Sequence, residues 1–269
     1  MKAPLFDYAR PDTLAGALAL LAEHGDAAAI LAGGQSLMPM LNLRMAQPRM
    51  LLDINRIDGL DAIVVDGDRL VIGALARHRD VLASTLVAAH ASLLTDALGH
   101  VAHAAIRNRG TFGGSLALAD PAAELPACAI CLGATIVTAS VDGERTHAAA
   151  DFFRGLYATA CRPDELILRV CIPLLPGWRF VFREVARRHG DYAIAGLAMG
   201  MAAGSCRVAF CGVETAPRRL PAIEAAVMGG TLPDLDVLEP MSSEEAPASL
   251  RRHLAGVLLR RSAEELRHG

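Results

Sequence analysis

In the first part of the chain, apolar residues at helical spacing alternate with short unbroken apolar runs. Residues 13–24 carry alanine and leucine at helical spacing and stop at a glycine, which predicts a helix. Residues 27–32 and 50–54 are short apolar runs, and both are predicted to be buried strands. Residues 37–44 predict a short helix between them, because Pro39 falls within its first turn.

The middle of the chain changes to β alternation and then to a long helical stretch. The sequence Asp66-Gly67-Asp68 predicts the turn of a hairpin, and residues 79–104 predict mostly helix. A further helix is expected at residues 124–132. The strands predicted in this part are residues 62–65, 70–72, 134–141 and 166–172, the last two being separated by a loop region. Helices that alternate with strands favour α/β or α+β layers.

Two prolines and a glycine within residues 173–177 predict a domain boundary. Beyond it, a small antiparallel sheet is expected from the strands 179–185, 195–202 and 206–211. Helices 221–228 and 249–267 are expected to pack on this sheet, joined by the polar segment 239–247. The predicted domains are therefore residues 1–175 and 176–269.

Composition narrows the classes of function. With 269 residues, 53% of them hydrophobic, the chain can bury a large core, and its net charge of −3 argues against a polyanionic partner such as nucleic acid. The only lysine is Lys2, which excludes a Schiff-base lysine or a Walker-type phosphate loop from the body of the chain. Six cysteines without a secretory signal fit a reducing cytoplasm. The longest apolar run, residues 125–139, is shorter than a membrane span.

A glycine loop follows the first predicted strand, at Ala32-Gly33-Gly34-Gln35-Ser36. Paired glycines let backbone N–H groups point into one concavity and let a phosphate approach closely, and the serine adds a hydroxyl. A strand-to-helix turn without any ligand explains the same residues equally well.

A second loop, Thr111-Phe112-Gly113-Gly114-Ser115, has similar chemistry. Two such loops can surround a pyrophosphate from both sides, and backbone dipoles can carry the anion. Neither loop has the G-x-G-x-x-G pattern, so the sequence gives little support to a Rossmann dinucleotide site.

Few other residues suggest chemistry. Asp120 and Glu124 could accept hydrogen bonds from sugar hydroxyls, although helix capping explains them as well. Cys128-x-x-Cys131 is interpreted as core rather than as a metal site. No catalytic residue and no metal ligand is assigned, because paired carboxylates, a nucleophile elbow and a His-Glu metal motif are all missing from the sequence. The chemistry is therefore expected to belong to a cofactor.

Several long motifs resemble one family. They are AGGQSLMP at residues 32–39, IRNRGTFGGSL at 106–116, ADPAAELP at 119–126, RRHGDYA at 187–193 and RRHL at 251–254. Together they resemble the FAD-binding (medium) subunits of molybdenum hydroxylases, which include carbon monoxide dehydrogenase and the xanthine dehydrogenase family. The resemblance covers essentially the whole chain. Many relatives have histidine at the position of Leu118, so any polar contact of that histidine is missing here.

The resemblance implies an α+β fold. A two-subdomain FAD-binding domain of the PCMH type, with subdomains of about residues 1–56 and 57–175, would precede a C-terminal domain of a small antiparallel sheet with a helical bundle. It implies that both glycine loops hold the FAD diphosphate, while other residues line the adenosine and flavin parts. The implied cofactor-binding residues are Leu31, Ala32, Gly33, Gly34, Gln35, Ser36, Leu37, Val101, Thr111, Gly113, Gly114, Ser115, Asp120, Glu124, Ile167, Arg183 and Tyr192. Without the family, Tyr192 could be an ordinary strand-edge tyrosine and Arg183 a solvated strand arginine.

The resemblance also implies a function. The chain would be the FAD-binding electron-transfer subunit of a cytoplasmic heterotrimer, expected as (αβγ)2. A large partner would oxidise the substrate at its molybdenum cofactor, and a small partner would pass electrons through two [2Fe–2S] clusters to FAD and then to an external acceptor. Two alternatives remain open: a flavin-free scaffold subunit and a stand-alone FAD oxidase. Neither the substrate nor the acceptor is indicated by the sequence.

Overall fold

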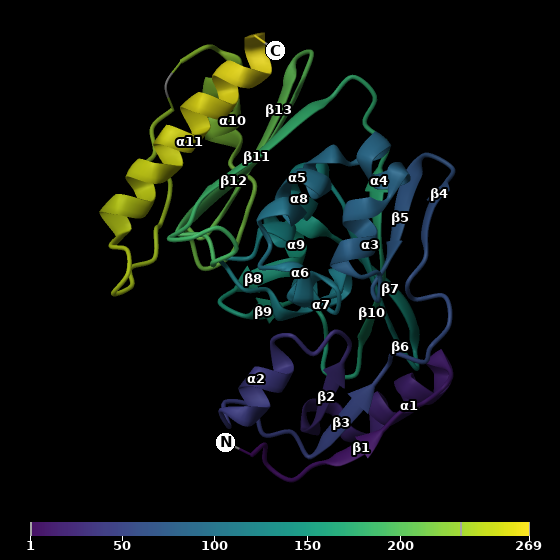
Figure 1. Cartoon of the computed structure of the whole chain (residues 1–269). Coiled ribbons are helices and arrows are strands. Elements are labelled where there is room, and N and C mark those ends of the chain that lie inside the picture. The colour runs from purple at the N-terminus through teal and green to yellow at the C-terminus, as the bar shows by residue number, and fades with distance from the viewer. Residues whose placement is uncertain (1, 232, 269) are drawn as a thin grey trace.

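A small parallel sheet forms the N-terminal part of the molecule, at the bottom of Figure 1. The computed structural model describes residues 2–231 and 233–268. In this sheet β3 (Met50–Asp53) pairs in parallel with β1 (Asp7–Ala9) and with β2 (Ala28–Leu31). The strand β1 was not predicted. All four residues of β2 are only half-buried, contrary to the prediction of a buried strand, because two of them, Ala29 and Ile30, line a cavity.

Two helices accompany this sheet, and both were predicted. The helix α1 (Leu14–His24) begins after Thr13, whose hydroxyl accepts a hydrogen bond from the Gly16 amide at 3.2 Å. A short 3-10 turn (Gly25–Ala27) then leads into β2. The helix α2 (Leu37–Asn42) directly follows the first glycine loop.

An antiparallel sheet of five strands lies next in the molecule, in the order β4-β5-β10-β6-β7. Its strands are β4 (Ile63–Asp66), β5 (Arg69–Gly73), β6 (Thr135–Ser140), β7 (Gly143–Ala148) and β10 (Leu166–Pro173). The predicted hairpin is confirmed by the pairing of β4 with β5. The strand β7 was missed, because its polar sequence GERTHA lies at the exposed edge of the sheet and lacks an apolar alternation. A two-stranded ribbon, β8 (Phe153–Gly155) and β9 (Ala158–Thr159), follows the short helix α9 (Ala149–Phe152).

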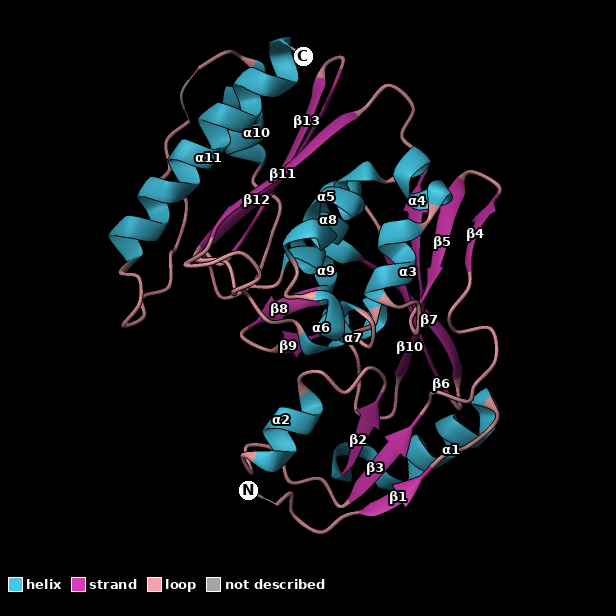
Figure 2. Ribbon diagram, viewed as in Figure 1, coloured by secondary structure: helices cyan, strands magenta, loops and turns pink. Residues whose placement is uncertain are grey.

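Short helices cover one face of the five-stranded sheet (Figure 2). They are α3 (His78–Ala83), α4 (Thr85–His90), α5 (Ser92–His100), α6 (Ala104–Arg107), α7 (Phe112–Leu118) and α8 (Glu124–Leu132). The predicted helical stretch 79–104 is thus divided into pieces. Ser84 ends α3 and caps α4 through a bond from the Val87 amide, and Ala91 leaves helical geometry with φ −148° and ψ 51°. Neither break is marked by glycine or proline in the sequence.

A second antiparallel sheet follows, and all of its predicted strands are confirmed. It consists of β11 (Arg179–Val185), β12 (Ala195–Ala202) and β13 (Ser205–Cys211), with β12 in the middle. One face of this sheet is covered by α10 (Pro221–Met228) and α11 (Ala248–His268), as Figure 2 shows. The opposite face meets α8, so the helices of the middle layer separate the two antiparallel sheets.

The helix α8 lies at the centre of the largest core. Every one of its residues is buried, including Cys128 and Cys131, which are core residues as predicted. This cluster of apolar side chains contains Leu70 and Ile72 of the five-stranded sheet together with Ala198 and Ala209 of the C-terminal sheet. Separate clusters lie under α11 and against α1. No helix within residues 2–231 and 233–268 is long and apolar enough to cross a membrane.

Candidate functional site

A cavity of about 630 Å³ is lined by residues of the N-terminal sheet and of the layer of short helices. Its walls come from parts of the chain that are far apart in sequence. Both glycine loops, the start of α8, the segment 161–167 and the turn at 190–192 contribute lining residues. A cavity of this size falls within the range of about 300–1,000 Å³ that is usual for small-molecule and cofactor sites.

The first glycine loop presents backbone donors to the cavity. Gly34 adopts φ +72°, a left-handed conformation that favours glycine. Within the described part of the chain, the amides of Gly33, Gly34, Gln35 and Ser36 have no hydrogen-bond acceptor. The Gln35 side chain donates to the Gly33 carbonyl at 3.0 Å and so stabilises the loop. Consecutive unpaired N–H groups in a concave loop form a site for an anion.

The second glycine loop is built differently, as the first turn of α7. Thr111 caps this helix by accepting a hydrogen bond from the Gly114 amide at 3.1 Å. The amides of Phe112 and Gly113 donate to the carbonyls of Ala76 and Ala74, both at 2.9 Å, and the Ser115 amide donates to the Thr111 carbonyl at 3.1 Å. All four amides that follow Thr111 are therefore engaged, so this loop has mainly hydroxyl groups to offer to a ligand.

The two loops lie directly against each other. A Cβ atom built on Gly33 would lie 2.3 Å from the carbonyl oxygen of Arg109, which is far inside van der Waals contact. Glycine at position 33 is therefore required by the packing of loop on loop. Gly113 is likewise closed in, because a Cβ there would lie 2.5 Å from the Cβ of Ala74.

Two carboxyl groups face the cavity from the side of the second loop. Asp120 accepts hydrogen bonds from the Ala122 amide at 2.9 Å and from the Tyr157 hydroxyl at 3.3 Å. Glu124 is 7% exposed, and burial raises its pKa to about 8, with the carboxylates of Glu184 and Asp120 acting in the same direction. At neutral pH Glu124 is mostly protonated, so it can donate a hydrogen bond as well as accept one.

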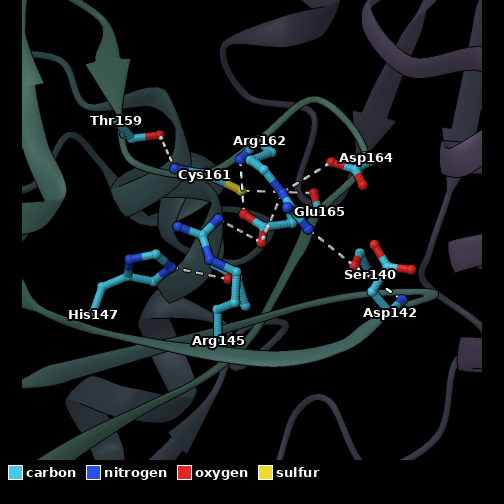
Figure 3. Close-up of polar contacts among 10 residues, drawn as sticks. Ser140, Asp142, Arg145, His147, Thr159, Cys161, Arg162, Asp164 and Glu165 are labelled. Atoms are coloured by element: carbon cyan, nitrogen blue, oxygen red, sulfur yellow. Dashed lines mark hydrogen bonds and ion pairs between the residues drawn. The ribbon is translucent and has the colours of Figure 1, made fainter.

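Another wall of the cavity is held rigid by a buried carboxylate. Figure 3 shows the side chains of Arg145 and Arg162 close to Glu165, which is 1% exposed and lines the cavity. Glu165 accepts a hydrogen bond from Arg145 Nη1 and another from the Arg162 backbone amide, both at 2.8 Å. The Sγ atom of Cys161 donates to the Glu165 carbonyl at 3.7 Å. Because both carboxylate oxygens accept hydrogen bonds from within the protein, Glu165 supports this wall of the cavity.

Comparison with known proteins identifies the fold and the family together. The family described as "FAD binding domain in molybdopterin dehydrogenase" matches residues 4–175. Caffeine dehydrogenase subunit beta of Pseudomonas sp. (strain CBB1) is 40% identical and covers 96% of this chain and 86% of its own length. The carbon monoxide dehydrogenase medium chain of Afipia carboxidovorans is 37% identical over 96% of both chains. The chain belongs to the FAD-binding medium subunits of the molybdenum hydroxylases.

Solved structures agree with this assignment over the whole length. A chain of carbon monoxide dehydrogenase from Hydrogenophaga pseudoflava superposes with a TM-score of 0.94 at 34% identity, and covers 99% of this chain and 98% of its own. A chain of quinoline 2-oxidoreductase from Pseudomonas putida 86 superposes with a TM-score of 0.91 at 35% identity over 99% and 98% of the two chains. The fold predicted from the motifs is confirmed, and the medium subunit is part of an oxidoreductase.

The cavity of this medium subunit suits FAD in its donors and acceptors. Unpaired amides on the first loop match a diphosphate, and the carboxyl groups of Asp120 and Glu124 match hydroxyl groups of a sugar or a ribityl chain. The hydroxyls of Ser36 and Ser115 lie in the same lining. The residues present therefore fit the cofactor that the family binds.

Most of the residues predicted for this site come together in the cavity. All of them line it except Leu31 and Arg183. The Leu31 carbonyl instead accepts a hydrogen bond from the Ile54 amide at 3.2 Å, next to the loop. Arg183 forms an ion pair with Glu265 of α11, because its position on β11 directs it to that helix. Tyr192 does line the cavity and is 66% exposed.

Several lining residues were not predicted, and His78 is the most informative of them. Its side chain is buried, and its Nε2 atom donates to the Thr111 carbonyl at 3.0 Å. Burial lowers the pKa of His78 to about 4, so the ring is neutral at physiological pH. A single histidine at the start of a helix gives no sequence signal for this role. Leu118 also lines the cavity.

Proposed function

We propose that this medium subunit binds FAD in the cavity between its glycine loops and transfers electrons for a molybdenum hydroxylase. The observation that carries the proposal is the run of four unpaired amides at Gly33–Ser36, which opens into a cavity of about 630 Å³ in a fold shared with this family. Such a run is an anion site without any lysine, and the body of this chain contains none.

Each side of the cavity has its own task in this proposal. The first loop holds the diphosphate through its amides, while Thr111 and Ser115 add hydroxyl groups from the second loop. Asp120 and Glu124 bind hydroxyl groups of the cofactor, and Tyr192 covers one end of the cavity. Val101 and Ile167 supply apolar contact. When bound, FAD supplies the redox chemistry, because it can exchange electrons one or two at a time.

The names of the relatives support the place of this subunit in a larger complex. The carbon monoxide dehydrogenase relatives are called medium chains, and the nicotine 6-hydroxylase of Paenarthrobacter nicotinovorans contains a medium subunit. We infer a large partner with the molybdenum cofactor and a small partner with two [2Fe–2S] clusters, assembled as (αβγ)2. Electrons would pass from those clusters through FAD to an external acceptor. The six free cysteines suit a cytoplasmic location.

The domain organisation is part of the same proposal. We assign FAD binding to residues 1–175, with subdomains of about 1–56 and 57–175, and a separate C-terminal domain to residues 176–269. The extent of the family match, residues 4–175, supports this division. The separate core under α11 supports it too.

The test is to identify the chromophore of the purified full-length chain. We expect one FAD per chain, seen in the visible spectrum and identified by chromatography after denaturation. Gly34→Val should lose it, because valine strongly disfavours φ +72°. Gly25→Val is the matched control, since Gly25 also has a positive φ, +47°, but does not line the cavity.

Two results would contradict the proposal. If neither the folded chain nor the chain reassembled with its partners takes up FAD, the scaffold alternative replaces it. If a substrate reduces the bound flavin in the isolated chain without any partner, the oxidase alternative replaces it.

A further inference from the structure

One arginine outside the cavity connects both glycine loops. Arg77 lies in the connection between β5 and α3, is half-buried, and does not line the cavity. Its Nη1 atom donates to the Arg109 carbonyl, just before the second glycine loop. Its Nη2 atom donates to Asn55 Oδ1 at 2.5 Å. The two ends of one guanidinium group therefore hold two different segments.

Asn55 continues this connection to the first glycine loop. Its Nδ2 atom donates to the Ala32 carbonyl at 2.8 Å and to the Leu31 carbonyl at 3.3 Å. The contacts therefore run from the Ala32 carbonyl through Asn55 and Arg77 to the Arg109 carbonyl. Each of these carbonyls lies next to the residues that form the anion site.

A buried carboxylate fixes the orientation of Asn55. Asp53 Oδ1 accepts from the Asn55 amide at 2.9 Å and from Asn55 Nδ2 at 2.7 Å, while Asp53 Oδ2 accepts from the Tyr8 hydroxyl at 2.6 Å. Burial alone would raise the pKa of Asp53, but the hydrogen bonds from Tyr8 and Asn55 hold it below its usual range. Because Nδ2 must donate to Asp53 and to the carbonyls, Oδ1 of Asn55 is the atom presented to Arg77.

Next to this connection, the first loop and the segment before the second loop meet backbone to backbone. Gly33 meets the Arg109 carbonyl without any side chain between them, as the 2.3 Å distance for an added Cβ shows. Two segments that meet backbone to backbone can separate unless something holds them. Arg77 and Asn55 form that connection from outside the cavity.

We propose that Arg77 is a positioning residue that sets the separation of the two glycine loops for the FAD diphosphate. This inference rests on the proposed function, because it assumes that the cavity takes FAD. In this proposal Arg77 does not contact the cofactor. It acts through the Arg109 carbonyl on one side and through Asn55 on the other.

The direct test compares Arg77→Met with Arg79→Met in the full-length, FAD-free chain. Arg79 is the matched control, because it lies two residues further on, is exposed, and within residues 2–231 and 233–268 its side chain has a single hydrogen-bond partner, Asp80, at 3.1 Å. We expect Arg77→Met to weaken the binding of FAD and of ADP by a similar factor, about tenfold or more, since both ligands carry a diphosphate. Arg79→Met should bind both ligands as the unchanged protein does. Fluorescence and calorimetric titrations measure these affinities.

The conservative variant Arg77→Lys shows whether the two-sided geometry of the guanidinium group is needed, or only its positive charge. Lysine keeps the positive charge at position 77 but cannot reach two acceptors with one planar group. Arg77→Lys should therefore remain close to Arg77→Met in its affinity for FAD. Recovery to the affinity of the unchanged protein would overturn the inference and would assign the effect to charge alone.

Hydrogen exchange distinguishes positioning from a general loss of stability. In Arg77→Met, the hydrogen-bonded amides of residues 112–115 should exchange faster, while those of β12 keep their protection. Faster exchange throughout the chain would mean a merely structural role and would overturn the inference.

The double variant Asn55→Ala with Arg77→Met should bind FAD within about twofold of the weaker single variant, because both changes break one connection. If the double variant instead loses FAD affinity by the product of the two single losses, the two residues act independently and the inference is contradicted.

The two proposals can fail separately. If the unchanged chain binds neither FAD nor ADP, the proposed function fails and this inference fails with it. If the unchanged chain binds FAD and Arg77→Met binds it equally well, only the inference about Arg77 fails.

Discussion

The two glycine loops have similar sequences and different structures. Both contain a Gly-Gly pair close to a serine, at Gly33-Gly34 and at Gly113-Gly114. In the first loop the amides have no acceptor among the residues that the structure describes, whereas in the second loop the amides after Thr111 are bound within α7 and to the carbonyls of residues 74 and 76. The same motif therefore forms a set of donors in one place and a helix start in the other.

This difference shows what a glycine pair contributes. Gly34 is needed for its backbone conformation, since its φ is +72°, while Gly113 is needed because Ala74 leaves no room for a Cβ. Chemistry toward the ligand follows the same division. The first loop presents backbone amides to a ligand, whereas the second loop and the residues after it present hydroxyl and carboxyl groups.

The largest effect on FAD affinity should come from Gly33→Ala. An added Cβ would collide with the Arg109 carbonyl at 2.3 Å, and backbone cannot give way without moving a loop. We expect FAD affinity to fall by about 100-fold or more, which is about 2.7 kcal/mol. Titration with FAD measures it. Gly99→Ala in α5 is the control, because its Cβ would meet open space, and equal affinities for the two variants would contradict the prediction.

Glu124→Gln should remove a pH dependence of stability that arises at the cavity wall beside the second loop. The pKa of Glu124 is raised from 4.5 to about 8, so its contribution to stability is fully present below about pH 4.5 and is lost as the pH rises through 8. Glutamine cannot ionise. The stability of the variant relative to the unchanged protein should therefore rise between pH 5 and pH 9, by an amount on the order of 4 kcal/mol. Urea unfolding of the FAD-free chain at several pH values checks this, with the exposed Glu23→Gln as control. Parallel stability profiles would rule the assignment out.

Gly113→Ala should act on stability more than on binding. Its Cβ would lie 2.5 Å from the Ala74 Cβ and 2.8 Å from the Ala74 Cα, in the packed core. Overpacking of this kind costs about 3 kcal/mol, which denaturant unfolding can measure. The folded fraction should keep more FAD affinity than Gly33→Ala. If the two variants behave alike, the contrast between the loops is wrong.

The smallest effects should separate the two hydroxyl residues at the helix starts. Thr111→Ala removes a cap bond and should cost about 1 kcal/mol of stability. Ser36 makes no side-chain cap bond to α2, so Ser36→Ala should leave stability unchanged and reduce only FAD affinity. Thermal unfolding and FAD titration of both variants provide the comparison. A similar loss of stability in Ser36→Ala would contradict it.

Much of the fold was predictable where apolar patterns were strong. The helix ending at His24, the hairpin around Gly67 and the C-terminal sheet all follow their patterns. The division into the three short helices α3, α4 and α5 was not predictable, because Ser84 and Ala91 interrupt the chain through backbone geometry that composition does not reveal. The helix α7 was missed because Gly113 and Gly114 indicated a loop, although Thr111 is a good capping residue.

The site was predictable where motifs are local. Nearly all residues taken from the family motifs line one cavity. Arg77, Asn55 and His78 could not be found this way, because their roles depend on contacts between segments more than 20 residues apart. Arg183 shows the opposite limit. The family resemblance implied a place near the flavin for Arg183, but its strand directs it to Glu265.

The buried helix α8 determines how the two proposed domains respond to cutting. It packs on both antiparallel sheets, and its core includes Phe182 and Cys211 from beyond residue 176. A protease that cleaves once between residues 174 and 177 should therefore leave two fragments that stay associated and co-elute. Expression of residues 1–175 alone would instead expose the apolar face of α8 to water, so that fragment should aggregate unless its missing half is supplied in trans.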